Sequence, residues 1–258
     1  GPGVTEPAVG DRVFALVGGG AYAEQAVANA EHTLPIPEGV SFDEASCFAE
    51  AYITAHMNLF GHAALADGEC VLLHGGGGGV NTAAIQLVKA LRPACRIAVT
   101  ASPGKIERVA ALGADLVVDY QSEDFSNAIK RFTDGAGADV ILDHIGAAYF
   151  ERNLKALAVN GRLVIIGIMQ GSDAEISLGR LLVKRQRIIG SVLRPRPNDE
   201  KTAIIRAFAD DAMPLIAARK IVPVIDRVVP LDDVVDAHRM MEASGHFGQI
   251  VLATGTEH

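Results

Sequence analysis

Five consecutive glycines, residues 75–79, separate an apolar run from an amphipathic one in the stretch VLLHGGGGGVNTAAIQL (71–87). When a strand ends in a glycine-rich turn and continues into a helix, backbone N–H groups and the positive helix end meet at one point, which favours a phosphate or pyrophosphate. Glycine removes the side chains that would keep such a ligand from the backbone. The sequence therefore predicts a strand–turn–helix unit with an anion-binding turn.

Within this turn, Gly76-x-Gly78-x-x-Asn81 matches the dinucleotide-binding fingerprint except at its third glycine. The third glycine serves close packing of the helix on the strand, so we expect Asn81 to shift the helix without abolishing the site. Glycine runs also occur in ordinary turns. The position of this run after the first strand of a long alternating series favours the dinucleotide interpretation.

From residue 70 onward, apolar β-rich runs alternate with helical stretches, the pattern of βαβ units. We predict strands at 70–74, 96–100, 115–120, 139–143, 162–167 and 187–193. Helices are expected near 80–91, 103–112, 122–133, 149–158 and 178–185, with Ser102 and Ser122 as N-caps. Right-handed crossovers then give a doubly wound parallel sheet of α/β class with strand order 3-2-1-4-5-6.

The flanking segments have a different pattern. Residues 1–48 show short β runs at 11–17 and 22–28 and then an extended turn into a helix at 35–45. After a proline-broken basic connector at 193–199, we predict elements that return to the first unit, namely a helix near 200–217, a strand at 223–229, a helix at 231–243 and a strand at 249–253. The predicted domains are 1–48, 49–193 and 194–258.

The end of the second strand indicates which dinucleotide is bound. An acidic residue about 20 positions after the glycines would hold the ribose of NAD, but Thr100 stands there. Ser102 and Lys105 open the next helix, where hydroxyl, N–H and ammonium groups can converge on a phosphate. A capping serine with a solvated lysine is the alternative. The missing acid favours NADP(H), with Tyr120 either covering the adenine or ending its strand without a ligand.

Composition excludes several other classes of function. A net charge of -8 speaks against a nucleic-acid binder, which would need Lys and Arg to neutralise phosphates. No apolar run is long enough for a membrane span, no start resembles a signal peptide, and we expect a cytoplasmic protein. Cys47, Cys70 and Cys95 lack metal-site spacing and are expected to be buried thiols. The histidines form no ligand pattern, so His56, His74 and His144 are interpreted as structural.

Several stretches follow one another in the order found in medium-chain dehydrogenases/reductases: VGDRVFALV (9–17), GGAYAEQAV (19–27), SPGK (102–105), ILDHIG (141–146) and ERNLKALAVNGRLV (151–164). The chain resembles their zinc-independent NADPH:quinone oxidoreductase (zeta-crystallin-like) group. This resemblance implies a GroES-like substrate domain split around an NADP(H)-binding Rossmann domain. By position it implies that the cofactor is lined by Thr54, Gly76, Gly78, Gly79, Val80, Ser102, Lys105, Tyr120, His144, Gly167, Ile168, Val192 and Leu193.

Two departures from relatives bear on the site. Zinc-dependent relatives insert a cysteine-rich loop in the segment that corresponds to residues 13–24, which contains no cysteine here. Glu50 stands near the position of their metal-binding cysteine. No metal is therefore expected. The opening GPGVTEPAVGDRV corresponds to a stretch inside the family's substrate domain. The N-terminal part of that domain is therefore expected to be absent, leaving a partial GroES-like unit.

The resemblance implies an NADPH-dependent reductase that passes hydride to a quinone or a similar conjugated carbonyl. Such an acceptor can take its proton from solvent, so no catalytic side chain is named. Arg194 and Arg196 either attract an anionic substrate or are solvated charges. The alternatives are a 2-enoyl thioester reductase and a non-catalytic NADPH-binding protein. The resemblance also implies a homodimer through the sixth strand, and no membrane partner is expected.

Overall fold

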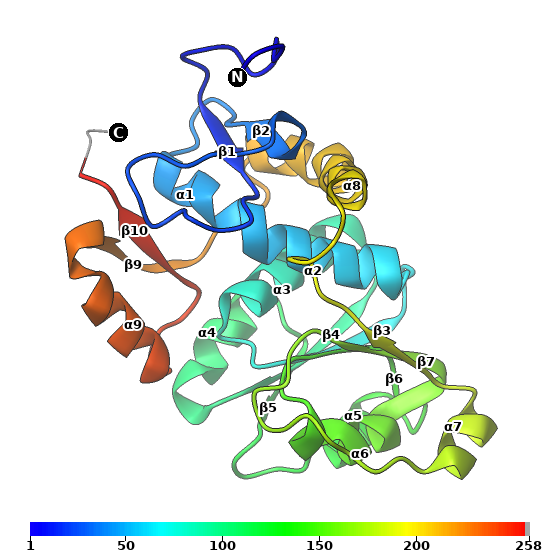
Figure 1. Cartoon of the computed structure of the whole chain (residues 1–258). Coiled ribbons are helices and arrows are strands. Elements are labelled where there is room, and N and C mark those ends of the chain that lie inside the picture. The colour runs from blue at the N-terminus through cyan, green and yellow to red at the C-terminus, as the bar shows by residue number, and fades with distance from the viewer. Residues whose placement is uncertain (256–258) are drawn as a thin grey trace. The chain divides into compact units, whose positions relative to one another are not determined.

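The computed structural model describes residues Gly1–Gly255 and divides the chain into two compact units (Figure 1). The first unit contains Gly1–Thr54, Gly78–Ala83 and the chain from Leu193 onward. The second contains Ala55–Gly77 and Ala84–Val192. Residues 49–54 and 78–83 thus group with the first unit, whereas the sequence prediction placed them in the dinucleotide-binding domain.

The second unit is built on a six-stranded parallel sheet. Its order is β5-β4-β3-β6-β7-β8, which confirms the predicted doubly wound α/β class and the order 3-2-1-4-5-6. The central strands are β-branched and leucine-rich because both faces of a parallel sheet are buried. The strands span Cys70–His74 (β3), Arg96–Ala101 (β4), Leu116–Asp119 (β5), Ala138–Asp143 (β6), Leu157–Ile165 (β7) and Arg187–Gly190 (β8).

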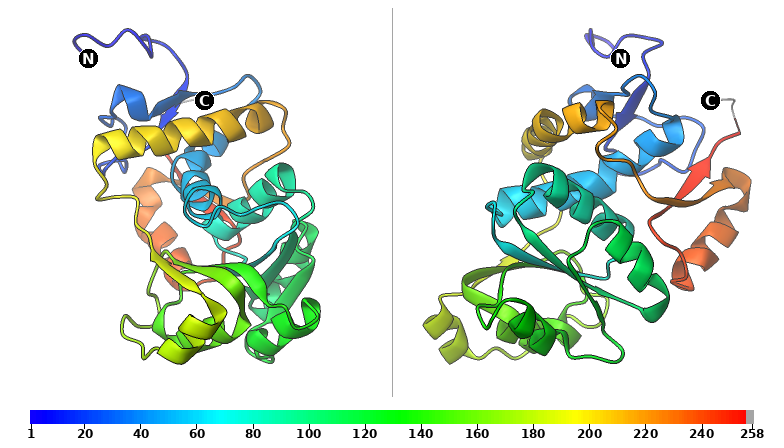
Figure 2. Two further views of the ribbon diagram at one scale, coloured as in Figure 1. Left: turned by 90° about the vertical axis from the view of Figure 1, so that its right-hand side faces the viewer. Right: turned by 180° about the vertical axis from the view of Figure 1, so that it is seen from behind.

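Helices cover both faces of this sheet (Figures 1 and 2). On one face α5 and α6 pack against alternate strand residues in a single apolar core, which includes Leu72, Ala98, Val118, Ile141 and Leu163. The other face carries α3 and α4. The helices span Gly79–Leu91 (α3), Ile106–Ala111 (α4), Phe125–Phe132 (α5), Ala147–Ala156 (α6) and Leu178–Lys184 (α7).

The first unit contains two small sheets. In one, β1 (Val13–Ala15) and β2 (Thr33–Pro35) are antiparallel. In the other, β9 (Ile225–Pro230) and β10 (Gln249–Ala253) are parallel, with α9 (Val234–Glu242) between them in sequence. Two further helices belong to this unit, α1 (Phe42–Cys47) and α8 (Asn198–Ala217). A capping box begins α1, because Ser41 accepts from Glu44 N while the Glu44 carboxylate accepts from Ser41 N.

A long helical run leads from α1 into the second unit. It passes through a π-helical segment (Phe48–Tyr52), α2 (Ile53–His56) and a second π-helical segment (Met57–His62). Phe48 anchors its first half, with ring centroids 6.0 Å from Phe14 and 4.8 Å from Tyr52. These rings and the side chain of Ile53 are almost fully buried.

Several local predictions are wrong. The Ser102 side chain makes no capping hydrogen bond, and the strand expected at 187–193 ends at Gly190. Residues 22–28 form bends and irregular chain rather than a strand. Ser122 is not an N-cap: its hydroxyl donates to Asp119, and α5 begins later, where Asp124 accepts from Ser126 N. The helix expected at 149–158 ends at Ala156, and β7 begins at Leu157 rather than at residue 162.

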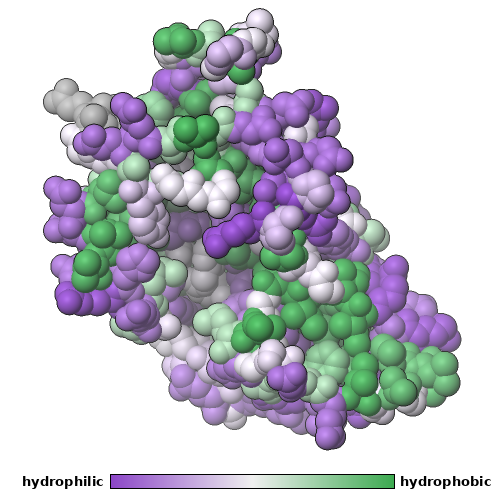
Figure 3. Space-filling model, viewed as in Figure 1, coloured by the Kyte–Doolittle hydropathy of each residue, from purple (hydrophilic) through white to green (hydrophobic). Residues whose placement is uncertain are grey.

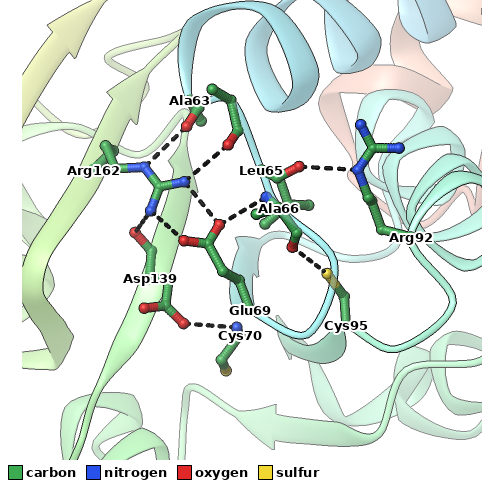
Figure 4. A network of polar contacts seen from close by, with 10 residues as sticks. Ala63, Leu65, Ala66, Glu69, Cys70, Arg92, Cys95, Asp139 and Arg162 are labelled. Carbon is green, nitrogen blue, oxygen red and sulfur yellow. Dashed lines mark hydrogen bonds and ion pairs between the residues drawn. The ribbon is translucent and has the colours of Figure 1, made fainter.

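A buried arginine lies at the amino edge of the sheet, where the parallel strands begin (Figure 4). Arg162, on β7, donates to the carbonyls of Ala63, Ala64 and Asp139, and its guanidinium forms a two-pronged ion pair with Glu69 at 2.8 Å. Only 5% of Arg162 is exposed. The arginine therefore joins β7 and β6 to the loop that leads from the helical run into β3.

The three cysteines are free and buried, as predicted. Burial raises the pKa of Cys47 and of Cys70 to about 12, so both remain thiols at neutral pH. Within residues 1–255, no helix combines the length and the apolar character needed to cross a bilayer.

Candidate functional site

The glycine turn lies at the carboxyl edge of the sheet, directly after β3. Gly75 has φ +75° and the N–H groups of Gly75 and Gly76 both donate to the Thr100 carbonyl, at 3.0 and 2.9 Å. A β-carbon on Gly76 would lie 2.2 Å from Val99 Cγ1 and close to Val109. Glycine at 76 is thus required for the turn to pack against β4 and α4.

Within the first unit, the start of α3 packs against the strand β10 and its approach. Gly78 forms a bridge with Gly248, and a β-carbon on Gly79 would lie 2.7 Å from the Gln249 side chain. Gln249 is a neighbour of the turn that no sequence motif indicated. Asn81 is buried, and α3 nevertheless runs without a break from Gly79 to Leu91.

Ser102, Lys105 and Tyr120 follow two adjacent strands. Ala101 of β4 is paired with Asp119 of β5, so Ser102 and Tyr120 come next at the same edge. Ser102 precedes a single 3₁₀ turn, Pro103–Lys105, in which Lys105 N donates to Ser102 O at 2.9 Å. Tyr120 is 39% exposed, and Ser102 and Lys105 are half-buried. The structure therefore brings these three predicted cofactor residues to the edge that also carries the glycine turn.

His144 and Gly167 follow β6 and β7. A β-carbon on Gly167 would lie 3.0 Å from His144 Cβ, and Met169 N donates to His144 O. Burial lowers the pKa of His144, so its imidazole is neutral at pH 7. Ile168 is 60% exposed and Val192 57% exposed, so both predicted cofactor neighbours leave apolar surface open.

The remaining predicted cofactor residues belong to the first unit. Thr54 lies in α2, Val80 in the first turn of α3, and Leu193 just after β8 with 5% of its surface exposed. The predicted set is thus divided between the two units, and the chain passes from one unit to the other within the glycine turn, between Gly77 and Gly78.

A cavity of about 940 Å³ opens within the first unit. Leu193, Arg194, Glu50 and Gln249 contribute to its wall, together with Tyr22 and His32. Burial raises the pKa of Glu50, while the charge of Arg194 opposes that shift. Because Arg194 already faces a carboxylate, its charge is partly balanced within the wall. The cavity has the size of a small-molecule site.

A fully buried polar row lies behind the glycine turn in the second unit. His74 Nδ1 is 3.0 Å from Thr100 Oγ1, and His74 Nε2 is 2.7 Å from Asn153 Oδ1. Asn153 Nδ2 in turn donates to Asp143 at 3.1 Å. Sequence reasoning classed His74 as structural and did not single out Asn153. The two are 79 positions apart, so no spacing rule pairs them.

No metal site is apparent in the part of the chain that the structure describes: no three His, Cys, Asp or Glu residues among 1–255 are placed to share an ion.

Comparison with known proteins gives consistent matches. The zinc-binding dehydrogenase family matches residues 79–210, just over half of the chain. A structure of the mycobacterial protein Rv1454c complexed with NADPH has a TM-score of 0.86 at 30% identity and covers 98% of this chain and 78% of its own. The quinone oxidoreductase of Pseudomonas syringae gives a TM-score of 0.82 at 28% identity, over 95% and 75%.

One curated relative is considerably longer. The synaptic vesicle membrane protein VAT-1 homolog of Danio rerio is 30% identical over 97% of this chain. The match covers 54% of that relative, so the chain spans about half of its length.

Proposed function

Because the chain belongs to the zinc-binding dehydrogenase family of the medium-chain dehydrogenase/reductase superfamily, we propose that it is an NADPH-dependent reductase of quinones or similar conjugated carbonyls. Oxidoreductase chemistry follows from the family. The preference for NADPH and the class of acceptor are our proposals. The relative complexed with NADPH and the quinone oxidoreductase among the similar structures support them.

The observation that carries the choice of cofactor is the edge formed by β4 and β5. Thr100 stands where an acidic residue would hold the ribose of NAD and repel a 2′-phosphate. Ser102, Lys105 and Tyr120 follow paired strand residues, so residues with a hydroxyl, an ammonium and an aromatic ring come from one edge of the sheet. We assign the 2′-phosphate to Ser102 and Lys105 and the adenine to Tyr120.

The glycine turn fits a pyrophosphate. Its backbone packs closely against Val99 at Gly76, and its glycines carry no side chains of their own, so N–H groups and the start of α3 can approach an anion closely. NADPH, when bound, supplies the hydride. The chain's own residues hold the cofactor and exclude water, and we assign this role to Gly76, Gly78, Gly79 and Val80 of the turn and to Thr54, His144, Gly167, Ile168, Val192 and Leu193.

We assign the acceptor to the cavity of the first unit, because Leu193 lines it and is also a proposed cofactor residue. A conjugated carbonyl reduced here can take its proton from solvent, and no side chain is assigned as an acid. We propose zinc-independent chemistry, since no cysteine lies between Val13 and Glu24 and a carboxylate, Glu50, stands where zinc-dependent relatives place a ligand.

The test is a fluorescence titration of the purified chain with NADPH and with NADH, for wild type and Lys105→Ala. Loss of one charged contact to a phosphate costs about 1.5–3 kcal/mol, so the Kd for NADPH should rise about 10- to 100-fold while the Kd for NADH stays within about twofold. Lys130→Ala is the matched control, because Lys130 is exposed in the last turn of α5, which returns to the amino edge of the sheet.

Addition of a quinone to the NADPH complex then tests the acceptor. Oxidation of NADPH supports the proposed reaction, whereas oxidation only with a 2-enoyl thioester assigns that alternative. Tight binding of NADPH without turnover of either acceptor indicates a non-catalytic NADPH-binding protein. A wild-type chain that binds NADPH no better than NADH contradicts the cofactor assignment.

We also propose a homodimer through β8. This outer strand of the sheet lies beside an apolar surface over α7, visible in Figure 3, in which Leu178, Leu182 and Val183 are 69%, 78% and 74% exposed. An unprotected edge strand beside a helix with exposed leucine and valine side chains is a liability in a monomer, and pairing with a second copy covers it.

A further inference from the structure

We propose that Thr100, His74 and Asn153 are positioning residues that form a one-way hydrogen-bond chain from the glycine turn to the loop after β6. This inference rests on the proposed function, since both loops carry residues assigned to NADPH. It adds a mechanical link between those loops that the family resemblance does not imply. The side chains belong to β3, β4 and α6, three elements that meet behind the carboxyl edge of the sheet.

The direction of the chain is fixed at its far end by Asp143. Its carboxylate accepts from Ile145 N at 2.8 Å, from Gly146 N at 3.2 Å and from Asn153 Nδ2 at 3.1 Å. Because a carboxylate only accepts, the amide of Asn153 must turn its NH₂ toward Asp143 and its oxygen toward the imidazole of His74.

That orientation fixes the tautomer of His74. The oxygen of Asn153 lies 2.7 Å from Nε2, so Nε2 carries the proton. Burial lowers the pKa of His74 to about 3, and the ring is neutral at physiological pH. Nδ1 is then an acceptor, and the hydroxyl of Thr100, 3.0 Å away, must donate to it.

The near end of the chain is the glycine turn. Once its proton points at His74, Thr100 Oγ1 presents a lone pair to Gly75 N, which donates to it at 3.2 Å in addition to its bond to the Thr100 carbonyl. In each of these hydrogen bonds the donor therefore lies on the same side: Gly75 donates to Thr100, Thr100 to His74, His74 to Asn153, and Asn153 to Asp143.

The chain is sealed from water. Thr100 is 1% exposed, and His74, Asn153 and Asp143 are 0% exposed. The rings of Phe125 and Tyr149 lie edge-on to the imidazole, with centroids at 4.7 and 4.9 Å. Water cannot replace a lost partner in such a site, and hydrogen bonds in series polarise one another. Reversal of one member would therefore leave its neighbours facing donor to donor or acceptor to acceptor.

Both ends of the chain stop on backbone N–H groups of loops that carry proposed cofactor residues. Gly75 precedes Gly76 in the phosphate-binding turn, and Ile145 follows His144. The hydrogen-bond chain thus couples the position of the glycine turn to the position of the loop after β6. A purely structural role for these residues would stabilise the unit without coupling the two loops.

The experiment compares Thr100→Val, which keeps the shape but removes the hydroxyl, with Thr100→Ser, which restores it. Amide hydrogen exchange is measured without ligand, and NADPH affinity is measured by titration. In Thr100→Val we expect exchange at Ile145 and Gly146 to rise at least tenfold, although Thr100 bonds to neither, and the Kd for NADPH to rise about tenfold. Thr100→Ser should return both values to within about threefold of wild type.

Two exchange patterns contradict the proposal. Faster exchange confined to Gly75 would show that the hydroxyl acts only locally. An equal rise at all amides of the second unit would show general destabilisation and hence a merely structural role.

The wild-type chain provides a second readout if Thr100→Val fails to fold. The ¹⁵N shifts of the His74 ring should show a neutral imidazole protonated at Nε2, and a ring protonated at Nδ1 or at both nitrogens overturns the proposal. Exchange and ring shifts need no cofactor. If the wild-type protein does not bind NADPH, the proposed function is contradicted. The exchange rates and the ring shifts still decide whether the hydrogen-bond chain exists.

Discussion

A single β-carbon decides whether the glycine turn can lie against β4. In Gly76→Ala the new methyl group would meet Val99 Cγ1 at 2.2 Å and Val109 at 3.1 Å, and both neighbours are fully buried. We expect a loss of about 2–3 kcal/mol in the free energy of unfolding, as for other overpacked cores, measured by urea denaturation. Gly104→Ala is the control, since its β-carbon meets nothing within 4 Å. Equal effects of the two substitutions would contradict this role for Gly76.

Individual residues were predictable from the sequence where backbone position alone determines their place. Ser102 and Tyr120 follow strands that any doubly wound sheet sets side by side, and the structure places them so. Asn153 and Gln249 were not predictable, because their partners, His74 and Gly79, come from distant parts of the sequence and are selected by packing. Such pairs follow no periodicity.

The elements themselves were largely predictable, and the errors lie at their ends. The stretch LKALAV is apolar enough for either a helix or a strand, and the change from α6 to β7 occurs at Leu157. The register between β6 and β7 shifts after the pair Ala138 and Leu157, and Asn160 adopts φ +62°. β7 can therefore continue through a segment whose sequence is typical of a turn. Asp124 rather than Ser122 caps α5 because the Ser122 hydroxyl is engaged by Asp119.

The contacts that join β6, β7 and the loop before β3 depend on Arg162, so its loss should lower the stability of the protein. Arg162→Met removes the fork that holds Glu69 and three carbonyls and leaves a partly buried carboxylate without its cation. Breaking a buried pair costs about 3–5 kcal/mol. We expect a loss in that range by urea denaturation. Arg131→Met is the control, because Arg131 pairs with Glu123 at the surface, where ion pairs contribute about 0–1 kcal/mol. Similar losses in both variants would show that the fork adds no more than a surface pair.

At the scale of the whole molecule, the exposed apolar surface over α7 should control association. Leu182→Asp places a charge in the proposed contact, so we expect a dimer in wild type and a monomer in the variant by light scattering at micromolar concentration. Val235→Asp, at a residue 58% exposed on α9, should remain dimeric. A monomeric wild type, or a Leu182→Asp variant that stays dimeric, contradicts association through this face.

The division of the chain into units has a consequence for synthesis. The first unit is made of residues 1–54, residues 78–83 and the residues after 192, and the second unit is the rest of the stretch between 54 and 193. Chains leave the ribosome amino end first, and domains fold as units. The parallel sheet can therefore close while β1, β2 and α1 still lack their C-terminal counterparts, among them Arg219, which pairs with Glu44. Residues 1–54 are thus synthesised before the second unit but complete their folding after it, and Phe14, Phe48 and Tyr52 remain accessible to chaperones until residues 193 onward have been made.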